Sequence, residues 1–280
     1  MIAIVTVSHG SDDVLRPFLA SVAAASRHPL SVVVVDNKPT GSAAQSIAEH
    51  FGASYVTDMN RGYGHGINLG VAGLGDAPDW ILVCNPDLVL APGSIDRLRD
   101  CGESDPRIGA VGPRILNEDG TTYASARSLP SIRTGVGHAL FANAWKTNPW
   151  TRRYLQGSAA DLRQRDTGWL SGACVLIRRS VFDQLSGFDE SYFMYFEDVD
   201  LGYRMHQAGY RSVYEPGAAV THTGAHSTQT ESARMLKAHH ESANRFLARK
   251  YHGPLLWPVR KALAAGLAVR SRFQQARGER

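Results

Sequence analysis

Four short runs of β-branched and apolar residues, each ending in polar residues, constrain the fold of this chain more than any other feature. A segment of helix-compatible composition follows each run, and the runs are MIAIVTVS (1–8), SVVVVDN (31–37), ASYVTD (53–58) and DWILVCNPD (79–87). Strands that alternate with helices pair in parallel through crossover connections. The pattern predicts an α/β fold with a mostly parallel sheet flanked by helices, and 280 residues suffice for one large core.

Polar residues gather where three of these predicted strands end: Ser8 with His9, Asp36 with Asn37, and Asn85 with Pro86 and Asp87. Ligands of parallel sheets bind beyond the carboxyl ends of the strands. Asp87 can offer an oxygen ligand to a hard divalent cation, and Asp36 can accept hydrogen bonds from a base or ribose. Both also fit ordinary turns. His222 ends another strand-like run, YEPGAAVTH (214–222), and becomes a metal-ligand candidate only with a partner such as Asp87.

The stretch GFDESYFMYFEDVDLGYRMHQAGY (187–210) places three carboxylates at the start of a predicted helix. They are Glu197, Asp198 and Asp200, and the buried side of the helix is expected to carry Leu201, Met205 and Ala208. Aromatic residues crowd the approach: Phe188, Tyr192, Phe193, Tyr195 and Phe196. A carboxylate against apolar rings tends towards the raised pKa of a general base, and aromatic faces are natural platforms for sugar rings. Acidic residues also favour the first turn of any helix, where they complement its dipole.

Several classes of nucleotide-binding and hydrolytic site are excluded by spacing. No GxGxxG follows the first predicted strand, and no GxxxxGK[ST] occurs. The run NRGYGHGINLG (60–70) either lets backbone amides approach a ligand or lets a helix pack closely on the sheet. No GxSxG or cysteine–histidine signature of covalent catalysis is present. The run GWLSGACVLIRR (168–179) is expected to form one buried strand. Cys84 and Cys174 lie inside apolar runs, where we expect small core residues.

Basic charge is concentrated near the end of the chain. Lys and Arg total 30 against 26 Asp and Glu, yet nine of the basic residues lie from Arg245 onward with one acid, Glu279. Because a nucleic-acid binder more often carries a basic stripe over its folded body, nucleic acid is not expected as a partner. We expect no signal peptide and no apolar run of membrane-spanning length, and therefore a cytoplasmic location.

The order of these motifs resembles the inverting family 2 glycosyltransferases of the GT-A fold. The resemblance covers residues 1–227 and is carried by VVVDN, NRGYGHGINLG, NPDL, WLSGACVLIRR, GFDESYFMYFEDVDLGYR and the following His222. Further motifs resemble the actinobacterial rhamnosyltransferases: ASARSLPS (124–131), NPWT (148–151), FMYFEDVDLG and AHS (225–227). Those enzymes transfer L-rhamnose from dTDP-L-rhamnose to decaprenyl-diphospho-N-acetylglucosamine, in the linker between peptidoglycan and arabinogalactan.

The resemblance implies a role for each matching residue. Nucleotide-sugar binding falls to Ser8, Asp36, Asn60, Arg61, Gly62, Asn85 and Asp87, with Asp36 on the pyrimidine base. Asp87 and His222 would hold Mg²⁺ or Mn²⁺, although Asn85 departs from the strict Asp-x-Asp form. Asp198 would be the catalytic base, with Glu197 beside it. Sugar and acceptor would meet near Trp169, Ser171 and Gly172.

Inverting transfer needs one base and one metal ion, without a covalent nucleophile. The implied partners are a dTDP-L-rhamnose donor and a polyprenyl-diphospho-N-acetylglucosamine acceptor. Two alternatives remain: a glycosyltransferase of this architecture with another donor or acceptor, and a non-catalytic sugar-nucleotide-binding or membrane-scaffolding protein.

We expect one glycosyltransferase domain over residues 1–244, with a nucleotide-sugar half (1–115) and an acceptor half (116–244). Residues 245–280 then form a basic amphipathic helical segment, with an apolar side that includes Leu256, Leu263 and Phe273. Such a segment can lie on an anionic membrane, so the protein would be peripheral at the inner face of the cell membrane. Alternatively it docks on the protein or forms a homodimer surface.

Overall fold

A computed structural model describes residues 1–39, 41–75, 78–131, 162–223, 232–253 and 258. The first half alternates strands and helices as predicted. These elements are β1 (Ile2–Ser8), α1 (Asp12–Ala25), β2 (Leu30–Asp36), α2 (Ala43–His50), β3 (Ser54–Thr57), α3 (Tyr63–Ala72), β4 (Trp80–Cys84), β5 (Leu88–Leu90) and α4 (Ser94–Glu103).

The second half is less regular. Its elements are β6 (Ile108–Asn117), β7 (Thr122–Tyr123), β8 (Ala126–Arg127), β9 (Arg165–Thr167), β10 (Trp169–Leu170), β11 (Cys174–Arg178), α7 (Arg179–Gln184), α8 (Glu197–Gln207), β12 (Arg211–His222) and α9 (Ser232–Lys250). Within the described ranges, no helix is long and apolar enough to cross a lipid bilayer.

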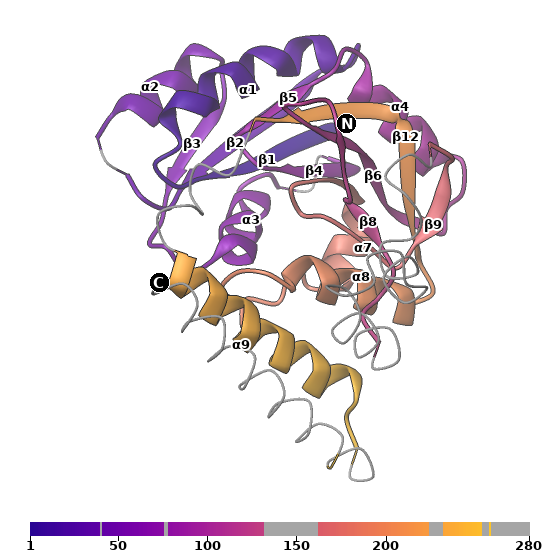
Figure 1. Cartoon of the computed structure of the whole chain (residues 1–280). Helices are drawn as coiled ribbons and strands as arrows, with labels where there is room; N and C mark the ends of the chain where they lie inside the picture. Colours follow the sequence, from indigo (N-terminus) through magenta and orange to yellow (C-terminus); the bar gives the residue numbers. More distant parts are fainter. Residues whose placement is uncertain (40, 76–77, 132–161, 224–231, 254–257, 259–280) are drawn as a thin grey trace.

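One large sheet forms the centre of the molecule, with strand order β3-β2-β1-β4-β11-β6-β12-β5 (Figure 1). The strands from β3 to β4 are parallel, as the alternating sequence predicts. Beyond β4 the sheet is mixed, because β11 lies antiparallel between β4 and β6. In this pairing Cys174 lies opposite Cys84, and both are buried free cysteines, which confirms their predicted place in the core.

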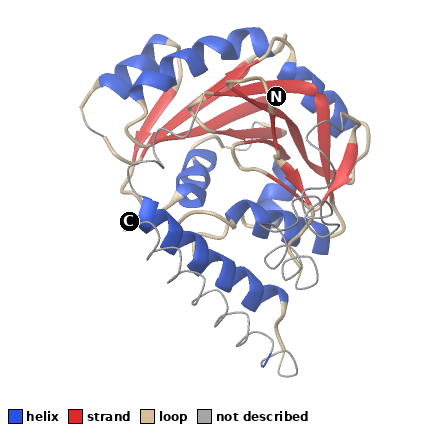
Figure 2. Cartoon of the chain, in the orientation of Figure 1, coloured by secondary structure: helices blue, strands red, loops and turns tan. Residues whose placement is uncertain are grey.

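Helices cover both faces of the sheet (Figure 2). Because side chains alternate along a strand, Ile2 and Ile4 of β1 pack with α1, α2 and α4, whereas Val5 and Val7 pack with α3, α7 and α8. A smaller cluster, which includes Val199 of α8 and Phe246 of α9, lies beyond the second helical layer. This arrangement leaves the carboxyl ends of β1, β2 and β4 at one edge, beside α3.

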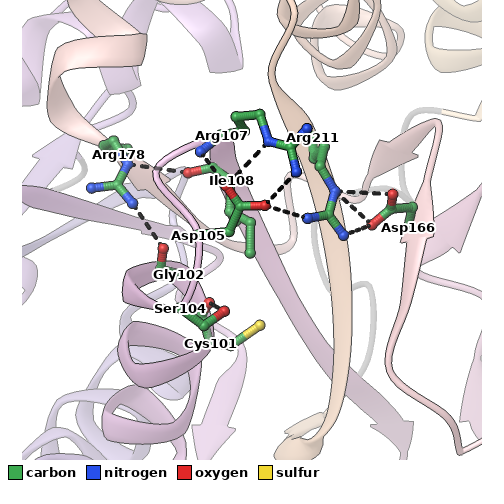
Figure 3. Close-up of polar contacts among 9 residues, drawn as sticks. All are labelled: Cys101, Gly102, Ser104, Asp105, Arg107, Ile108, Asp166, Arg178 and Arg211. Carbon is green, nitrogen blue, oxygen red and sulfur yellow. Dashed lines mark hydrogen bonds and ion pairs between the residues drawn. The ribbon is translucent and has the colours of Figure 1, made fainter.

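An arginine network holds the opposite end of the sheet, where β6 and β12 begin. Figure 3 shows Arg211 between two carboxylates: its Nη1 lies 2.7 Å from Asp105 Oδ2, and its Nη2 lies 2.6 Å from Asp166 Oδ1. Hydrogen bonds from Arg107 and Arg211 lower the pKa of Asp105 to about 2. Arg178 donates to the carbonyl oxygens of Gly102 and Ile108. These contacts join α4, β6, β9, β11 and β12 away from the polar strand ends.

Three predictions from sequence need correction. The run GWLSGACVLIRR is two strands, β10 and β11, because Gly172 and Ala173 form a turn between them. Ala208 does not belong to the buried side of α8; it is the exposed residue that ends this helix, whereas Leu201 and Met205 are buried as expected. The proposed boundary between residues 244 and 245 falls inside α9.

Helix α9 packs on the domain beyond that boundary. Phe246 is completely buried, Arg249 Nη2 lies 2.8 Å from Asp189 Oδ2, and Lys250 donates to the carbonyl oxygen of Pro130. Residues up to 250 are therefore part of the folded domain. The predicted amphipathic segment after residue 253 lies outside the described residues, apart from position 258, as do the NPWT and AHS motifs.

Candidate functional site

Polar side chains from three neighbouring loops meet where β1, β2 and β3 end. His9 Nδ1 lies 2.7 Å from Asn37 Oδ1, and the Asn37 side-chain amide donates to Asn60 Oδ1 at 3.4 Å. The family resemblance implies that Asn60 binds the nucleotide, and the structure shows that His9 and Asn37 are its neighbours. Ser8 is fully buried, and its hydroxyl has no hydrogen-bond partner among the described residues.

Asp36 is the buried carboxylate of this edge. Its Oδ2 accepts a 2.8 Å hydrogen bond from the Tyr55 hydroxyl, and its Oδ1 accepts one of 3.0 Å from the Lys38 amide. Burial and this bond to Asp36 raise the pKa of Tyr55 to about 12. Each carboxylate oxygen keeps a second lone pair. Asp36 is thus fixed in place at the strand end with capacity to accept a further donor.

The glycine-rich run joins this edge to the segment that precedes α8. Gly62 has φ of +115°, and a Cβ there would lie 2.3 Å from the carbonyl oxygen of Phe193. The Tyr63 amide donates to that same oxygen at 3.1 Å. Arg61, by contrast, extends outward and lies 3.3 Å from Asp58 Oδ1. The glycine therefore serves close packing of two loops, whether or not its amide also approaches a ligand.

Asp87 and His222 lie side by side, although 135 residues separate them in sequence. His222 Nε2 lies 3.0 Å from Asp87 Oδ1, because β5 and β12 pair with His222 opposite Leu88. The Thr223 amide and hydroxyl both donate to the Asp87 carbonyl oxygen, which fixes the turn. Adjacency of the two side chains agrees with the sequence-based prediction, and their role as metal ligands stays a prediction.

The donor set fits a divalent cation that is shared with a phosphate. A carboxylate and an imidazole supply two ligands, and Mg²⁺ or Mn²⁺ bound through few protein ligands completes its shell with phosphate oxygens and water. In the parts of the chain that are described, no three His, Cys, Asp or Glu side chains cluster as a complete metal site. An ion at Asp87 and His222 can take further oxygen ligands from a bound diphosphate.

The three carboxylates at the start of α8 lie in three different environments. Asp198 Oδ2 accepts a 3.0 Å hydrogen bond from the Gly172 amide, and Oδ1 accepts one of 2.8 Å from the Val199 amide. Glu197 is 7% exposed, and its Oε2 has no hydrogen-bond partner within the described ranges. Asp200 is completely buried between Arg204 and Arg249. Asp200 is therefore a structural carboxylate that ties α9 to α8.

The pair Glu197 and Asp198 has the electrostatics of a proton acceptor. Burial raises the pKa of Glu197, and the charge of Asp198 raises it further. Burial also raises the pKa of Asp198, against the opposing effect of the Gly172 and Val199 amides. Two adjacent buried carboxyls share their titration, because ionising one disfavours ionising the other. Tyr195 and Phe196, just before them, have φ of 65° and 68°, which marks a strained entry to α8.

Several aromatic residues near α8 belong to the core. Phe188 and Tyr192 are buried at 2% and 1% exposure, so the expectation that they form a sugar platform is wrong. Trp169 is also buried, its indole N–H donates to the Ser128 carbonyl oxygen, and the Arg127 guanidinium lies 5.3 Å from its ring centre. The structure thus gives Trp169 a packing role, and its contact with sugar stays a prediction.

The Gly172–Ala173 turn connects the candidate base, Asp198, to the turn of residues 85–87, here called the metal turn. The Ser171 hydroxyl oxygen accepts from the Ala173 amide. The Gly172 backbone amide donates to Asp198, and the Ala173 carbonyl oxygen accepts a 2.9 Å hydrogen bond from the backbone amide of Asn85. Sequence reasoning missed one member of this assembly, Tyr63, whose hydroxyl donates to the Gly172 carbonyl oxygen at 2.8 Å. Its place in the glycine-rich run was the available signal.

Comparison with known proteins identifies this architecture. A family model described as "Glycosyltransferase like family 2" matches residues 1–243. The N-acetylglucosaminyl-diphospho-decaprenol L-rhamnosyltransferase of Mycobacterium tuberculosis is 42% identical over 99% of this chain and 95% of its own length. Rhamnosyltransferase WbbL of Escherichia coli is 28% identical over 89% of this chain and 94% of its own length.

Solved structures support the same fold at low sequence identity. The mannosyltransferase PcManGT from Pyrobaculum calidifontis, in complex with GDP-Man and Mn²⁺, has a TM-score of 0.58 and 14% identity, covering 97% of this chain and 71% of that one. GalNAc-T7 with UDP, GalNAc and Mn²⁺ has a TM-score of 0.61 and 16% identity, covering 93% and 53%. The chain belongs to the family 2 glycosyltransferases and has their GT-A fold.

Proposed function

We propose that this protein is a metal-dependent inverting rhamnosyltransferase, which moves L-rhamnose from dTDP-L-rhamnose to decaprenyl-diphospho-N-acetylglucosamine. The 42% identical relative carries the corresponding name over nearly the full length of both chains. The proposal places the reaction in the synthesis of the arabinogalactan linker of the cell wall. The identities of the donor and the acceptor are inferred from that similarity.

Asp198 is the base of the proposed reaction. It takes the proton of the acceptor hydroxyl as that oxygen attacks the anomeric carbon, while the nucleoside diphosphate leaves from the opposite face. Its raised pKa, caused chiefly by burial, makes it a stronger proton acceptor than a solvated aspartate. Buried Glu197 beside it disfavours a second negative charge, so the pair tends to hold a proton.

The donor binds on the side of the Gly172–Ala173 turn that lies away from Asp198. Asp36 and Asn60 contact the nucleotide at the ends of β2 and β3, and Asp87 with His222 would hold the divalent ion beside its diphosphate. Such an ion, when bound, supplies Lewis-acid stabilisation of the charge on the departing diphosphate. Trp169, Ser171 and Gly172 then border the space between donor and acceptor.

One observation carries this assignment. The Gly172–Ala173 turn is hydrogen-bonded on one side to Asp198 and on the other to Asn85, two residues before Asp87. A two-residue turn thus fixes the base relative to the metal turn. Displacement at one carbon requires a base and a leaving-group stabiliser held in a constant relative position.

A donor panel tests the proposal. Purified protein is incubated with dTDP-L-rhamnose, UDP-galactofuranose or UDP-glucose, a lipid-diphosphate N-acetylglucosamine acceptor, and Mg²⁺ or Mn²⁺. We expect transfer from dTDP-L-rhamnose with inversion at the anomeric carbon, and loss of transfer on chelation. Preference for another donor would establish the alternative glycosyltransferase, and no turnover with any donor would favour a non-catalytic binding protein.

Substitution of the base gives a second test. Asp198→Asn should lower kcat by about 10²–10⁴ while leaving nucleotide binding nearly intact. The matched control is Asp183→Asn, since Asp183 is a half-exposed carboxylate paired with Arg179 on the surface helix α7. If Asp198→Asn keeps near-normal turnover while Asp183→Asn does the same, Asp198 is not the base.

A lipid-linked acceptor would require the enzyme to work at a membrane. We therefore propose a cytoplasmic protein that binds the inner face of the cell membrane through residues 254–280, and the test is truncation after Gly253. Truncation should reduce binding to anionic vesicles and slow transfer to a long-chain acceptor, with little effect on a short soluble analogue. Equal losses with both acceptors would instead assign the segment to the fold or to a homodimer interface.

A further inference from the structure

Tyr63 makes a hydrogen bond for which the proposed function gives no role. It is the first residue of α3 and comes directly after the donor-loop residues Arg61 and Gly62. Its hydroxyl crosses to the other half of the domain and donates a 2.8 Å hydrogen bond to the Gly172 carbonyl oxygen. Burial raises the pKa of Tyr63 well above its usual value, so the hydroxyl keeps its proton and acts as a donor.

Gly172 lies directly between Tyr63 and Asp198. A Cβ built on it would be 3.4 Å from Tyr63 Cε1 and 3.6 Å from Asp198 Cβ. Its carbonyl oxygen accepts from Tyr63, and its amide donates to Asp198 Oδ2 at 3.0 Å. The two side chains therefore hold the two peptide groups on either side of one Cα atom.

We propose that Tyr63 is a positioning residue for the base: its hydroxyl fixes the Gly172 backbone, whose amide in turn orients the Asp198 carboxylate. The inference rests on the proposed role of Asp198. Without the hydroxyl, the Gly172 carbonyl oxygen loses its side-chain donor and the turn can rotate. The Gly172 amide then makes a weaker hydrogen bond to Asp198. A carboxylate that loses a hydrogen-bond donor is less stable in its ionised form, and its position is less fixed.

This role predicts a kinetic signature that loss of stability would not produce. Burial raises the pKa of Asp198, whereas the amides of Gly172 and Val199 and the charge of Arg127 lower it, and Glu197 shares its titration. Weakening the Gly172 contact therefore raises the pKa of Asp198. Because the base must be ionised to react, the acid limb of the pH profile of kcat moves to higher pH. Asp36 is held by Tyr55 and Lys38, and Asp87 by His222 and Thr223, all from outside the Gly172–Ala173 turn. KM for the nucleotide sugar is therefore expected to stay near its original value.

The experiment compares Tyr63→Phe with Tyr210→Phe. Tyr210 also donates one hydrogen bond, of 2.9 Å to Gln184 Oε1, but at the far end of α8. For Tyr63→Phe we expect a fall in kcat on the order of 10-fold near pH 7, partial recovery at higher pH, and unchanged nucleotide binding. Tyr210→Phe should match the parent protein. Thermal unfolding and dTDP binding with Mn²⁺ confirm that both variants are folded.

The outcomes separate this inference from the proposed function. If Asp198→Asn is inactive but Tyr63→Phe has the parent pH profile and kcat, the positioning role is overturned and the base assignment stands. If Asp198→Asn is active, the base assignment itself fails. A fall in kcat at all pH values, equal to the loss of folded protein, would also overturn the positioning role.

Discussion

Replacing Asp200 with asparagine should destabilise the protein strongly. The carboxylate is completely buried and has ion pairs to Arg204 of α8, at 2.6 Å, and to Arg249 of α9. Asparagine keeps the shape but removes the charge, and its amide group would face two guanidinium groups. The predicted effect is therefore a loss of stability, in contrast to the loss of activity predicted for Asp198→Asn.

The magnitude follows from how much of each cation is buried. Breaking one side of a buried ion pair costs about 3–5 kcal/mol when the charge left behind has no other partner. Here the Arg249 side chain is 42% exposed, and Arg204 keeps hydrogen bonds to the carbonyl oxygens of Leu185 and Gly187. Both cations retain part of their stabilisation, so we expect about 2–3 kcal/mol.

Urea unfolding followed by fluorescence measures this change, and calorimetry should show Tm lower by about 5 °C for a chain of this size. Asp183→Asn again serves as the control, because a surface pair contributes at most about 1 kcal/mol. A change below about 1 kcal/mol for Asp200→Asn would refute the reasoning. It would mean that α9 is held by its apolar contacts, with the ion pairs contributing nothing measurable.

Two further predictions concern the site itself. Glu197→Gln should leave the acid limb of activity unchanged, because the charge of Asp198 raises the pKa of Glu197, and Glu197 therefore still holds its proton when Asp198 ionises. It should raise stability above neutral pH, since a carboxyl with a raised pKa loses stability as pH rises from its unfolded pKa to its folded pKa. A pH profile and urea curves at two pH values check both effects. Asp87→Ala should weaken Mn²⁺-dependent dTDP binding more than His222→Ala, measured by titration calorimetry, because only the carboxylate supplies charge; equal losses would contradict this ranking.

The parallel part of the sheet was predictable because its information is local. Each of the first four strands is a β-branched run with polar residues at its end, and these ends meet at one edge as parallel pairing requires. The neighbourhood of Asp87 and His222 follows from the same rule, since both end strand-like runs. The position of β11 between β4 and β6 was not predictable, because it depends on pairing across about 90 residues of chain.

The roles of the acidic residues on α8 show where local sequence stops being informative. Residues 197, 198 and 200 project in different directions from a helix with about 100° between successive side chains, so they must meet different surroundings. The helical pattern predicts this divergence but not the partners. Gly172 lies 26 residues before Asp198, and Arg249 lies 49 residues after Asp200. Only the return of β10 and α9 to this helix gives the proposed base, Asp198, its Gly172 donor and makes Asp200 a structural anchor.

Contact with the glycine-rich loop accounts for the burial of Glu197, whose Oε2 has no hydrogen-bond partner among the described residues. A solvated carboxylate beside Asp198 would be ionised at neutral pH, and the charge of Asp198 would not raise its pKa. Burial against the glycine-rich loop, where a Cβ on Gly64 would lie 3.7 Å from Glu197 Cβ, keeps water away and couples the two titrations. A Cβ on Gly64 would also lie only 2.9 Å from Phe188 Cβ, so a bulkier residue there would push the loop away from the segment that leads to the acidic pair. Gly64→Ala should then lower the pH at which Asp198 ionises, together with stability, and a pH profile that is unchanged in a destabilised variant would show that packing alone is affected.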